Sequence, residues 1–273
     1  MCDLGFLKQG NGGTFSLPLY RYTANGERVD NITEWGLKQF HKAYGKEGRN
    51  SPGEAEEPTE GGGTPAATPA DLLTSAAAGA SSPQGGRTKR RFINKEDVFH
   101  YVYAVLHDPN YRETYALNLK RDLPRIPFYP DFWTWTAWGK RLMALHIGYG
   151  TVAPFGLTRT DTPDEGARAA GVLPKPILKA DREKGVIRID TETTLSGIPK
   201  EAFDYRLGNR SGLEWILDQY KEKTPKDPTI REKFNTYRFV DYKEHVIDLI
   251  ARVTMVSVET VEVVEAMRLA RRR

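Results

Sequence analysis

The stretch "EDVFHYVYAVLHDPNYRETYALNLKRDLPRIPF", residues 96–128, predicts two helices and the point where helix must stop. Asn94 can cap the first helix, because Asp97 stands three residues later and the two can exchange hydrogen bonds. Apolar residues then follow at helical spacing, which predicts a buried helix whose stripe is Phe99, Val102 and Leu106, widened by Val98 and Val105.

Asp108-Pro109 is typical of a cap followed by proline at the first helical position. A second helix is therefore predicted from Pro109 to Arg121, with its inward side formed by Tyr111, Tyr115 and Leu119. Pro124 and Pro127 push the residues before them away from helical angles, so the chain is expected to leave the hairpin extended.

Two further stretches have helical periodicity. "PDFWTWTAWGKRLMALHIGYG", residues 130–150, predicts a third helix that buries Phe132, Trp135, Leu142 and Leu145. The valine-rich run from 243 to 273 suits strands as well as helices, but its apolar residues recur at intervals of three and four. We interpret it as two helices with a break near residues 254–257.

Other segments predict strands. "FSLPLYRYTANGERVDNI", residues 15–32, favours two strands around an Asn25-Gly26 turn, and a helix over residues 31–45 follows, with its buried side at Trp35, Leu37, Phe40 and Tyr44. Residues 175–199 alternate around "DREKG" and predict a hairpin. "YRLGNRSG", residues 205–212, predicts a turn before a helix that starts at Ser211 or Gly212.

Together these elements predict an α+β fold. A helical hairpin and the third helix would pack with a mixed or antiparallel sheet, built from residues 175–210 and the N-terminal strands, and C-terminal helices would close it. The expected domains are residues 1–45, an insertion over 46–91, and a main domain over 92–273. The insertion is rich in Gly, Pro, Ala, Ser and Thr, so we expect it to be disordered.

Composition limits the possible functions. The 273 residues include 40 Lys and Arg against 36 Asp and Glu, a net charge of +4 that permits a polyanionic partner without requiring one. There is no run of 18 apolar residues and no signal peptide before Gly13, so a cytoplasmic protein without a membrane partner is expected. The single Cys2 excludes an internal disulfide and a cysteine-rich zinc site.

Six segments in this order carry a resemblance: "FSLPLYRY", "NIT", the long stretch quoted first, "SGIP", "LEWILDQY" and "HVIDLIARVTMVSVETVEVV". The chain resembles the C-terminal specificity region of type ISP restriction-modification enzymes over almost its whole length apart from the insertion. The resemblance implies a target-recognition domain that binds duplex DNA. It also implies methyltransferase, helicase and nuclease modules, in cis or as a separate subunit, which would use S-adenosylmethionine, ATP and magnesium.

The catalytic motifs of those modules are not found in this sequence. It has no Gly-x-x-x-x-Gly-Lys-Ser/Thr loop, no Asn-Pro-Pro-aromatic segment and no Gly-x-Gly-x-x-Gly turn. We therefore expect no enzyme activity and no cofactor in this chain alone, which would be a fragment, a split subunit or a truncated gene product. "DREK", residues 181–184, is interpreted as a solvated turn, and His100 with His107 as packing or surface residues without a third metal ligand.

Base readout needs donors on an exposed loop, so we predict that bases are contacted by Arg206, Asn209 and Arg210. Backbone phosphates would be contacted by Lys120, Arg125, Lys179, Arg182, Lys184, Arg188 and the basic end of the insertion, Lys89, Arg90 and Arg91. A charged, solvated surface is the competing interpretation of the second group.

Two other hypotheses remain: a docking module, which an exposed apolar patch over Trp133, Trp135 or Trp138 would support, and an independent enzyme with converging carboxylates or histidines.

Overall fold

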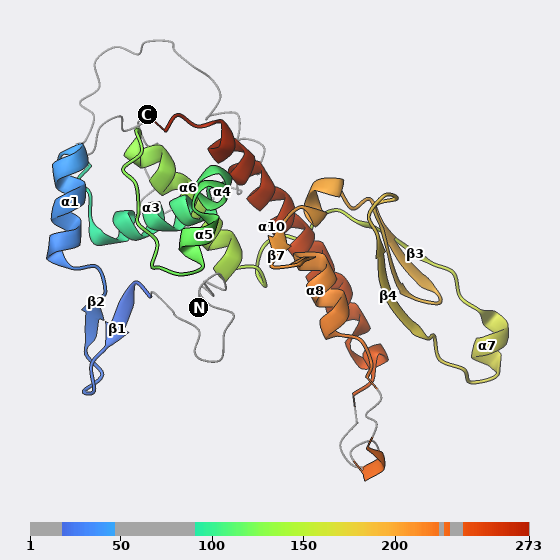
Figure 1. The fold of residues 1–273 in the computed structure, drawn as a ribbon. Helices are drawn as coiled ribbons and strands as arrows, with labels where there is room; N and C mark the ends of the chain where they lie inside the picture. Colours follow the sequence, from blue (N-terminus) through green and yellow to red (C-terminus); the bar gives the residue numbers. More distant parts are fainter. Residues whose placement is uncertain (1–17, 47–90, 224–226, 230–236, 273) are drawn as a thin grey trace, which may run out of the picture.

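The computed structural model describes residues 18–46, 91–223, 227–229 and 237–272, and most of the predicted insertion lies outside them. A helical part and a sheet part are joined by one long helix that runs along both (Figure 1). This is the α+β fold that the sequence predicts. The helical part contains α1 (Glu34–Tyr44), α3 (Lys95–His107), α4 (Pro109–Thr114), α5 (Ala116–Leu119) and α6 (Phe132–Ile147).

The first predicted helix begins as expected. Asn94 caps α3, and its side chain and that of Asp97 exchange hydrogen bonds with each other's backbone N–H groups. Val98 and Val105 are buried as predicted, but the deepest side also includes Tyr101 and Ala104, and Phe99 of the predicted stripe is only partly buried. Val102 and Leu106 are only partly buried at the edge of the core. A helix that is apolar on most of its surface does not reveal from spacing alone which side is deepest.

The contact between α3 and α6 depends on a glycine. A Cβ atom on Gly139 would lie 1.8 Å from the carbonyl oxygen of His100, so the two backbones approach more closely than any larger residue permits. The residues predicted to face inward from α6 are all buried: Phe132, Trp135, Leu142 and Leu145.

The proline-directed segment crosses the aromatic core as an extended chain. The Tyr101 hydroxyl donates to the carbonyl of Pro127 at 2.8 Å and accepts from the amide of Tyr129 at 2.7 Å. The Tyr111 hydroxyl donates to the carbonyl of Arg125 at 2.9 Å. Tyrosine hydroxyls therefore satisfy backbone groups that a continuing helix would have paired.

The second helix is shorter than predicted. It breaks at Tyr115, whose backbone angles are φ −107° and ψ 19°, so α4 and α5 replace the single helix expected from Pro109 to Arg121. Tyr111 is buried as predicted, whereas Tyr115 is exposed and Leu119 is partly buried. Residues 113–118 are all exposed, so packing against the described residues contributes little to a longer helix here.

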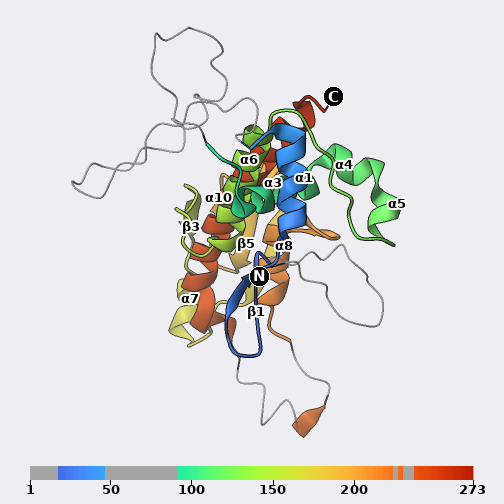
Figure 2. The ribbon, with the colours of Figure 1, turned by 90° about the vertical axis from the view of Figure 1, so that its left-hand side faces the viewer.

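The N-terminal strands β1 (Tyr20–Tyr22) and β2 (Arg28–Asp30) form the predicted hairpin, with Gly26 at φ 81°. Among the described strands they pair only with each other, beside α1 (Figure 2). The prediction that they belong to the larger sheet is therefore wrong. Thr33 caps α1, and Phe40 is buried as expected, but Trp35 is 72% exposed. The prediction that Trp35 is buried is therefore wrong.

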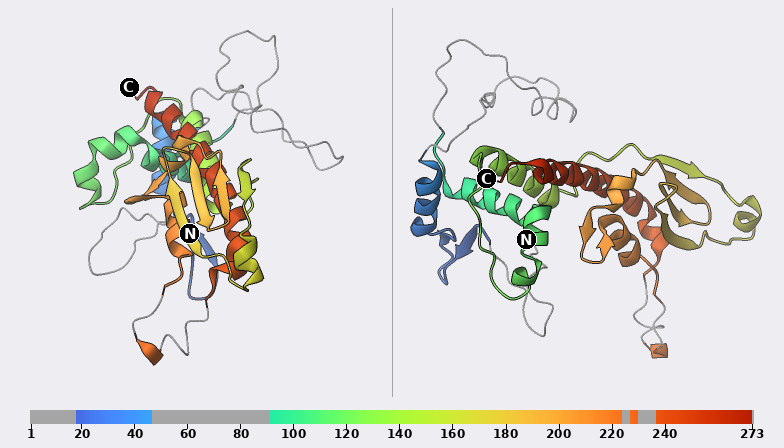
Figure 3. Two further views of the ribbon diagram at one scale, coloured as in Figure 1. Left: turned by 90° about the vertical axis from the view of Figure 1, so that its right-hand side faces the viewer. Right: turned by 45° about the horizontal axis from the view of Figure 1, so that its top comes forward.

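The sheet has four antiparallel strands in the order β3-β6-β5-β4. Their bounds are β3 (Thr158–Asp161), β4 (Pro176–Asp181), β5 (Val186–Asp190) and β6 (Thr193–Ser196), and the sequence interpretation missed β3. The inner side packs Ile187, Ile189 and Leu195 into a second core with α8 (Gly212–Gln219) and α10 (Lys243–Leu269). Figure 3 shows the strands in front of these two helices, with the outer side of the sheet uncovered.

The C-terminal run is one continuous helix, α10, so the predicted break near residues 254–257 is wrong. Thr254 and Ser257 donate their hydroxyls to the carbonyls of Ile250 and Val253, four residues earlier. Those bonds let both buried polar side chains remain inside the helix. Because Ile250 packs in the sheet core and Met267 in the helical core, α10 connects the two parts.

Short elements complete the described chain. They are α7 (Glu165–Ala169), η1 (Lys200–Phe203), β7 (Arg206–Leu207), β8 (Arg210–Ser211) and η2 (Phe239–Tyr242).

Candidate nucleic-acid interface

The predicted base-reading loop is a tight hairpin between β7 and β8, with Gly208 at φ 70° in the turn. The indole nitrogen of Trp215 on α8 donates to the carbonyl of Leu207 at 2.8 Å. Ser211 and Glu214 form a capping box where α8 begins. The Trp215 hydrogen bond and the capping box thus hold the two strands of the turn, which keeps its exposed side chains in fixed positions.

All three predicted base-reading residues lie on this turn. Arg206 donates to the carbonyl of Asn209, and Arg210 pairs with Asp218 at 2.7 Å while its guanidinium lies 5.5 Å from the centre of the Trp215 ring. Asn209 is exposed. Each guanidinium carries five N–H donors, so these contacts orient the arginines and leave donors for a base edge.

The outer side of the sheet carries a row of two cations and two hydroxyls. Lys179 on β4 is paired in register with Arg188 on β5, Arg188 with Thr194 on β6, and Thr194 with Thr160 on β3. We call these four residues the basic row. The predicted strands β4 and β5 place both cations on the same side of the sheet. Strand β3, which was not predicted, adds Thr160.

No carboxylate among the described residues forms an ion pair with Lys179 or Arg188. Like charges directly opposite each other on neighbouring strands destabilise a sheet, so the pair works against folding unless an anion compensates it. Phosphate oxygens suit this row, because lysine, arginine and threonine are all donors to phosphate.

The tip of the β4–β5 hairpin lies near the β7–β8 turn. Arg182 at the tip pairs with Asp204, two residues before Arg206. Hydrogen bonds from Ser211 lower the pKa of Glu214 most strongly, and the charges of Arg206 and Arg182 lower it further. The structure therefore brings the predicted base-reading residues and part of the predicted phosphate-binding group together.

The remaining predicted cations are less concentrated. Lys184 is exposed and forms a long ion pair of 3.8 Å with Asp181. Lys120 and Arg125 are exposed on the helical part, at the end of α5 and in the proline-directed segment. Arg91 pairs with Asp97 at 3.0 Å, and Lys89 and Arg90 lie outside the described residues.

The observation that would support a docking module is not found. Trp133 is 3% exposed and Trp135 is 1% exposed, and Trp138 is a partly buried neighbour of the same core. The tryptophans of α6 therefore stabilise the helical part and form no apolar patch.

The two histidines considered as metal ligands, His100 and His107, both pack within the helical part. His100 is buried against α6, and the Nδ1 atom of His107 is 2.8 Å from the carbonyl of Tyr103. Within the described ranges, no three His, Cys, Asp or Glu residues are grouped so that they could hold a metal ion. "DREK" forms the tip of the β4–β5 hairpin, as the sequence predicts.

The chain belongs to the family described as type ISP C-terminal specificity domain, which matches residues 1–249. It is therefore related to the specificity module of larger type ISP enzymes. No curated protein matches it significantly. None of the described helices is long and apolar enough to cross a membrane.

Solved structures agree with this assignment. A DrdV–DNA complex determined by cryo-electron microscopy matches with 49% identity and a TM-score of 0.70 over 91% of this chain, which spans 21% of the DrdV chain. A nuclease-deletion mutant of the type ISP enzyme LlaGI, in complex with a DNA substrate mimic, matches with 27% identity and a TM-score of 0.51, over 68% of this chain and 14% of that one.

The ATP-dependent type ISP restriction-modification enzyme LlaBIII, bound to DNA, shares the fold at 24% identity. Its TM-score is 0.52, and the match covers 66% of this chain and 11% of LlaBIII.

Proposed function

We propose that this chain recognises a specific sequence in duplex DNA, as the specificity part of a type ISP restriction-modification system. Adenine methylation and ATP-dependent cleavage belong to other modules, in the same polypeptide or in a separate subunit, and those modules bind S-adenosylmethionine, ATP and magnesium. The single observation that carries the DNA-binding proposal is the basic row on the uncovered side of the sheet, whose two cations lie side by side without an ion pair to any residue that the structure describes. Family membership and the DNA-bound relatives support it.

The two sets of residues have different roles in this proposal. The basic row binds phosphates and sets affinity and register, whereas the β7–β8 turn places Arg206, Asn209 and Arg210 against base edges. Arg182 at the hairpin tip pairs with Asp204, two residues before Arg206, so the sheet and the turn are in contact at this point. In this proposal one duplex contacts both.

The phosphate role is tested with Lys179→Ala combined with Arg188→Ala. Each phosphate contact releases counterions, so the plot of log affinity against log salt should lose a slope of about 2 for the two residues. Lys38→Ala with Lys42→Ala on α1 removes the same charge from exposed positions outside the sheet. Fluorescence anisotropy with a labelled duplex measures the salt dependence of binding for the two double variants. Equal slopes would show that the basic row does not contact the DNA backbone.

The base-reading role is tested by selecting bound duplexes from a randomised library. Arg206→Ala, Asn209→Ala and Arg210→Ala should each relax the selected sequence at one position, by about 1–3 kcal/mol of discrimination, while non-specific binding persists. Asp218→Asn serves as a control, because it removes the partner of Arg210 and keeps the arginine. An unchanged consensus in all three alanine variants would show that another loop reads the bases.

A further inference from the structure

A basic pocket lies beside α6 in the helical part, away from the sheet and its basic row. Its volume is about 310 Å³, and its lining consists of Arg91, Thr136, Ala137, Lys140, Arg141 and Ala144. It adjoins a second pocket of about 260 Å³ that shares Arg141 and Ala144. The lining holds three cations and no carboxylate.

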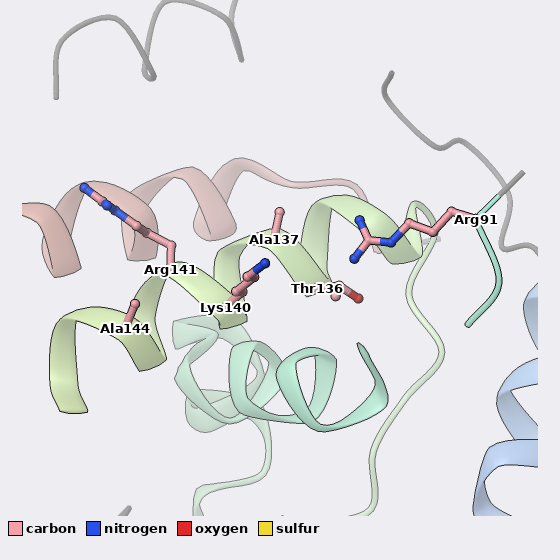
Figure 4. A pocket seen from close by; sticks show the side chains of 6 residues that line it. All are labelled: Arg91, Thr136, Ala137, Lys140, Arg141 and Ala144. Atoms are coloured by element: carbon pink, nitrogen blue, oxygen red, sulfur yellow. The ribbon is translucent and has the colours of Figure 1, made fainter. Parts of the chain in front are cut away.

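The three cations of the pocket differ in how strongly other side chains hold them. The Arg91 guanidinium is held by Asp97 at 3.0 Å and stacks 4.0 Å from the centre of the Trp133 ring, so it is fixed at the entrance of the pocket. Arg141 extends away toward α10, where it pairs with Glu259. Lys140 is exposed and forms no ion pair with any residue that the structure describes. In Figure 4 the Arg91 and Lys140 head groups lie on either side of Thr136 and Ala137.

A neutral histidine lies beneath the pocket. His100 packs against α6, and burial lowers the pKa of this histidine most strongly. The charges of Glu96 and Asp97 raise this pKa and those of Lys140 and Arg91 lower it, and the net shift leaves the imidazole neutral at pH 7. Lys140, Ala137 and Ala144 are exposed, so an anion can reach the pocket from solvent.

Thr136 adds a polar group without a partner. Its side chain is 2% exposed, and its Oγ1 atom has no hydrogen-bond partner among the described residues. A buried hydroxyl normally finds a partner, but this oxygen is closed to solvent and could meet a ligand only if the side chain rotated.

We propose that this pocket binds a phosphate group, with Lys140 as the principal charge and Arg91 as a fixed fork. Arginine presents paired N–H groups that match phosphate oxygens, and lysine complements them as a point charge. The favoured source is the backbone of duplex DNA, and to that extent the inference rests on the proposed function. The helical part then extends the footprint on DNA beyond the sheet.

The experiment compares Lys140→Ala and Lys140→Arg with Lys38→Ala, an exposed lysine on α1. One arm titrates the full chain with inorganic phosphate by calorimetry. The other arm measures the salt dependence of duplex binding. Lys140→Ala should abolish the phosphate heat and reduce the salt slope by about 1, Lys140→Arg should retain both, and Lys38→Ala should match the unaltered chain.

The two arms separate the possible sources. A loss in the DNA arm, with or without the phosphate arm, supports the backbone as the ligand. If Lys140→Ala loses only the phosphate heat, the pocket binds phosphate, but its ligand is a free phosphate and not the DNA backbone. If Lys140→Ala matches Lys38→Ala in both arms, the pocket is not a phosphate site. Failure of the basic row in its own test leaves this result unaffected, because the two sets of variants share no residue.

Discussion

At the scale of single residues, the most deeply buried charge secures the end of the described chain. Asp108 caps α4 and is fully buried, and Arg272 binds both of its carboxylate oxygens, at 2.7 and 3.2 Å. The same guanidinium donates to the carbonyls of Met267 and Ala270. The sequence interpretation recognised Asp108 as a cap but gave no partner for it, because that partner is 164 positions away.

Arg272→Ala should therefore lower the free energy of unfolding by roughly 3 kcal/mol, because it leaves a buried carboxylate without its counter-charge. Arg268→Ala is the matched control, since Arg268 is more exposed and its ion pairs with Glu113 and Glu265 are long, at 3.7 and 3.4 Å. Its cost should stay below about 1 kcal/mol. Urea denaturation measures both, and similar losses for the two variants would contradict the role assigned to Asp108.

At the scale of elements, the packing of α3 on α6 decides how the helical part is built. Both helices were predicted in type and extent, yet no local pattern indicated that Gly139 is the contact point. The small residue permits the close approach to His100, and the aromatic residues around it fill the rest of the interface.

Gly139→Ala should lower the free energy of unfolding by about 1–3 kcal/mol, because the new methyl group forces the two helices apart. Gly36→Ala on α1 is the opposite case, since a Cβ there would meet atoms no nearer than 3.5 Å. That change should stabilise the chain by about 0.5–1 kcal/mol through helix propensity. Thermal unfolding of the two variants checks the difference in sign, and two shifts in the same direction would show that the approach at Gly139 is not tight.

At the scale of the whole molecule, α10 meets the helical part beside two partly buried histidines, His107 and His146. Tyr103 of α3 contacts Nδ1 of His146 at 2.7 Å, and Nε2 of His146 lies 3.1 Å from Thr260 on α10. A neutral ring satisfies both contacts, with Nδ1 accepting and Nε2 donating. Burial lowers the pKa of His146 to about 4 and that of the neighbouring His107 to about 4.

The folded state therefore opposes protonation that the unfolded chain accepts near pH 6.5. Stability from these two rings is fully present above that pH and is lost as pH falls toward about 4, by about 1.4 kcal/mol per unit for each histidine. Urea denaturation between pH 7.5 and 4.5 measures this slope. His107→Gln should reduce it, whereas His245→Gln, an exposed residue of α10, should preserve it. An unchanged slope in His107→Gln would show that other groups cause the acid sensitivity.

The sequence alone determined where α3, α4 and α8 begin, that the chain is extended at Pro124 and Pro127, and which turn carries Arg206, Asn209 and Arg210, because caps, turns and periodicity act over a few residues. It also placed Lys179 and Arg188 on one hairpin, although their pairing in register was not predicted. Only the tertiary structure decided that α10 is continuous, that β3 adds Thr160 to the basic row, that Trp35 is exposed, and that Arg91 and Lys140 share a pocket. These features depend on contacts between residues far apart in the chain, whose free energy is set by packing and leaves no local pattern.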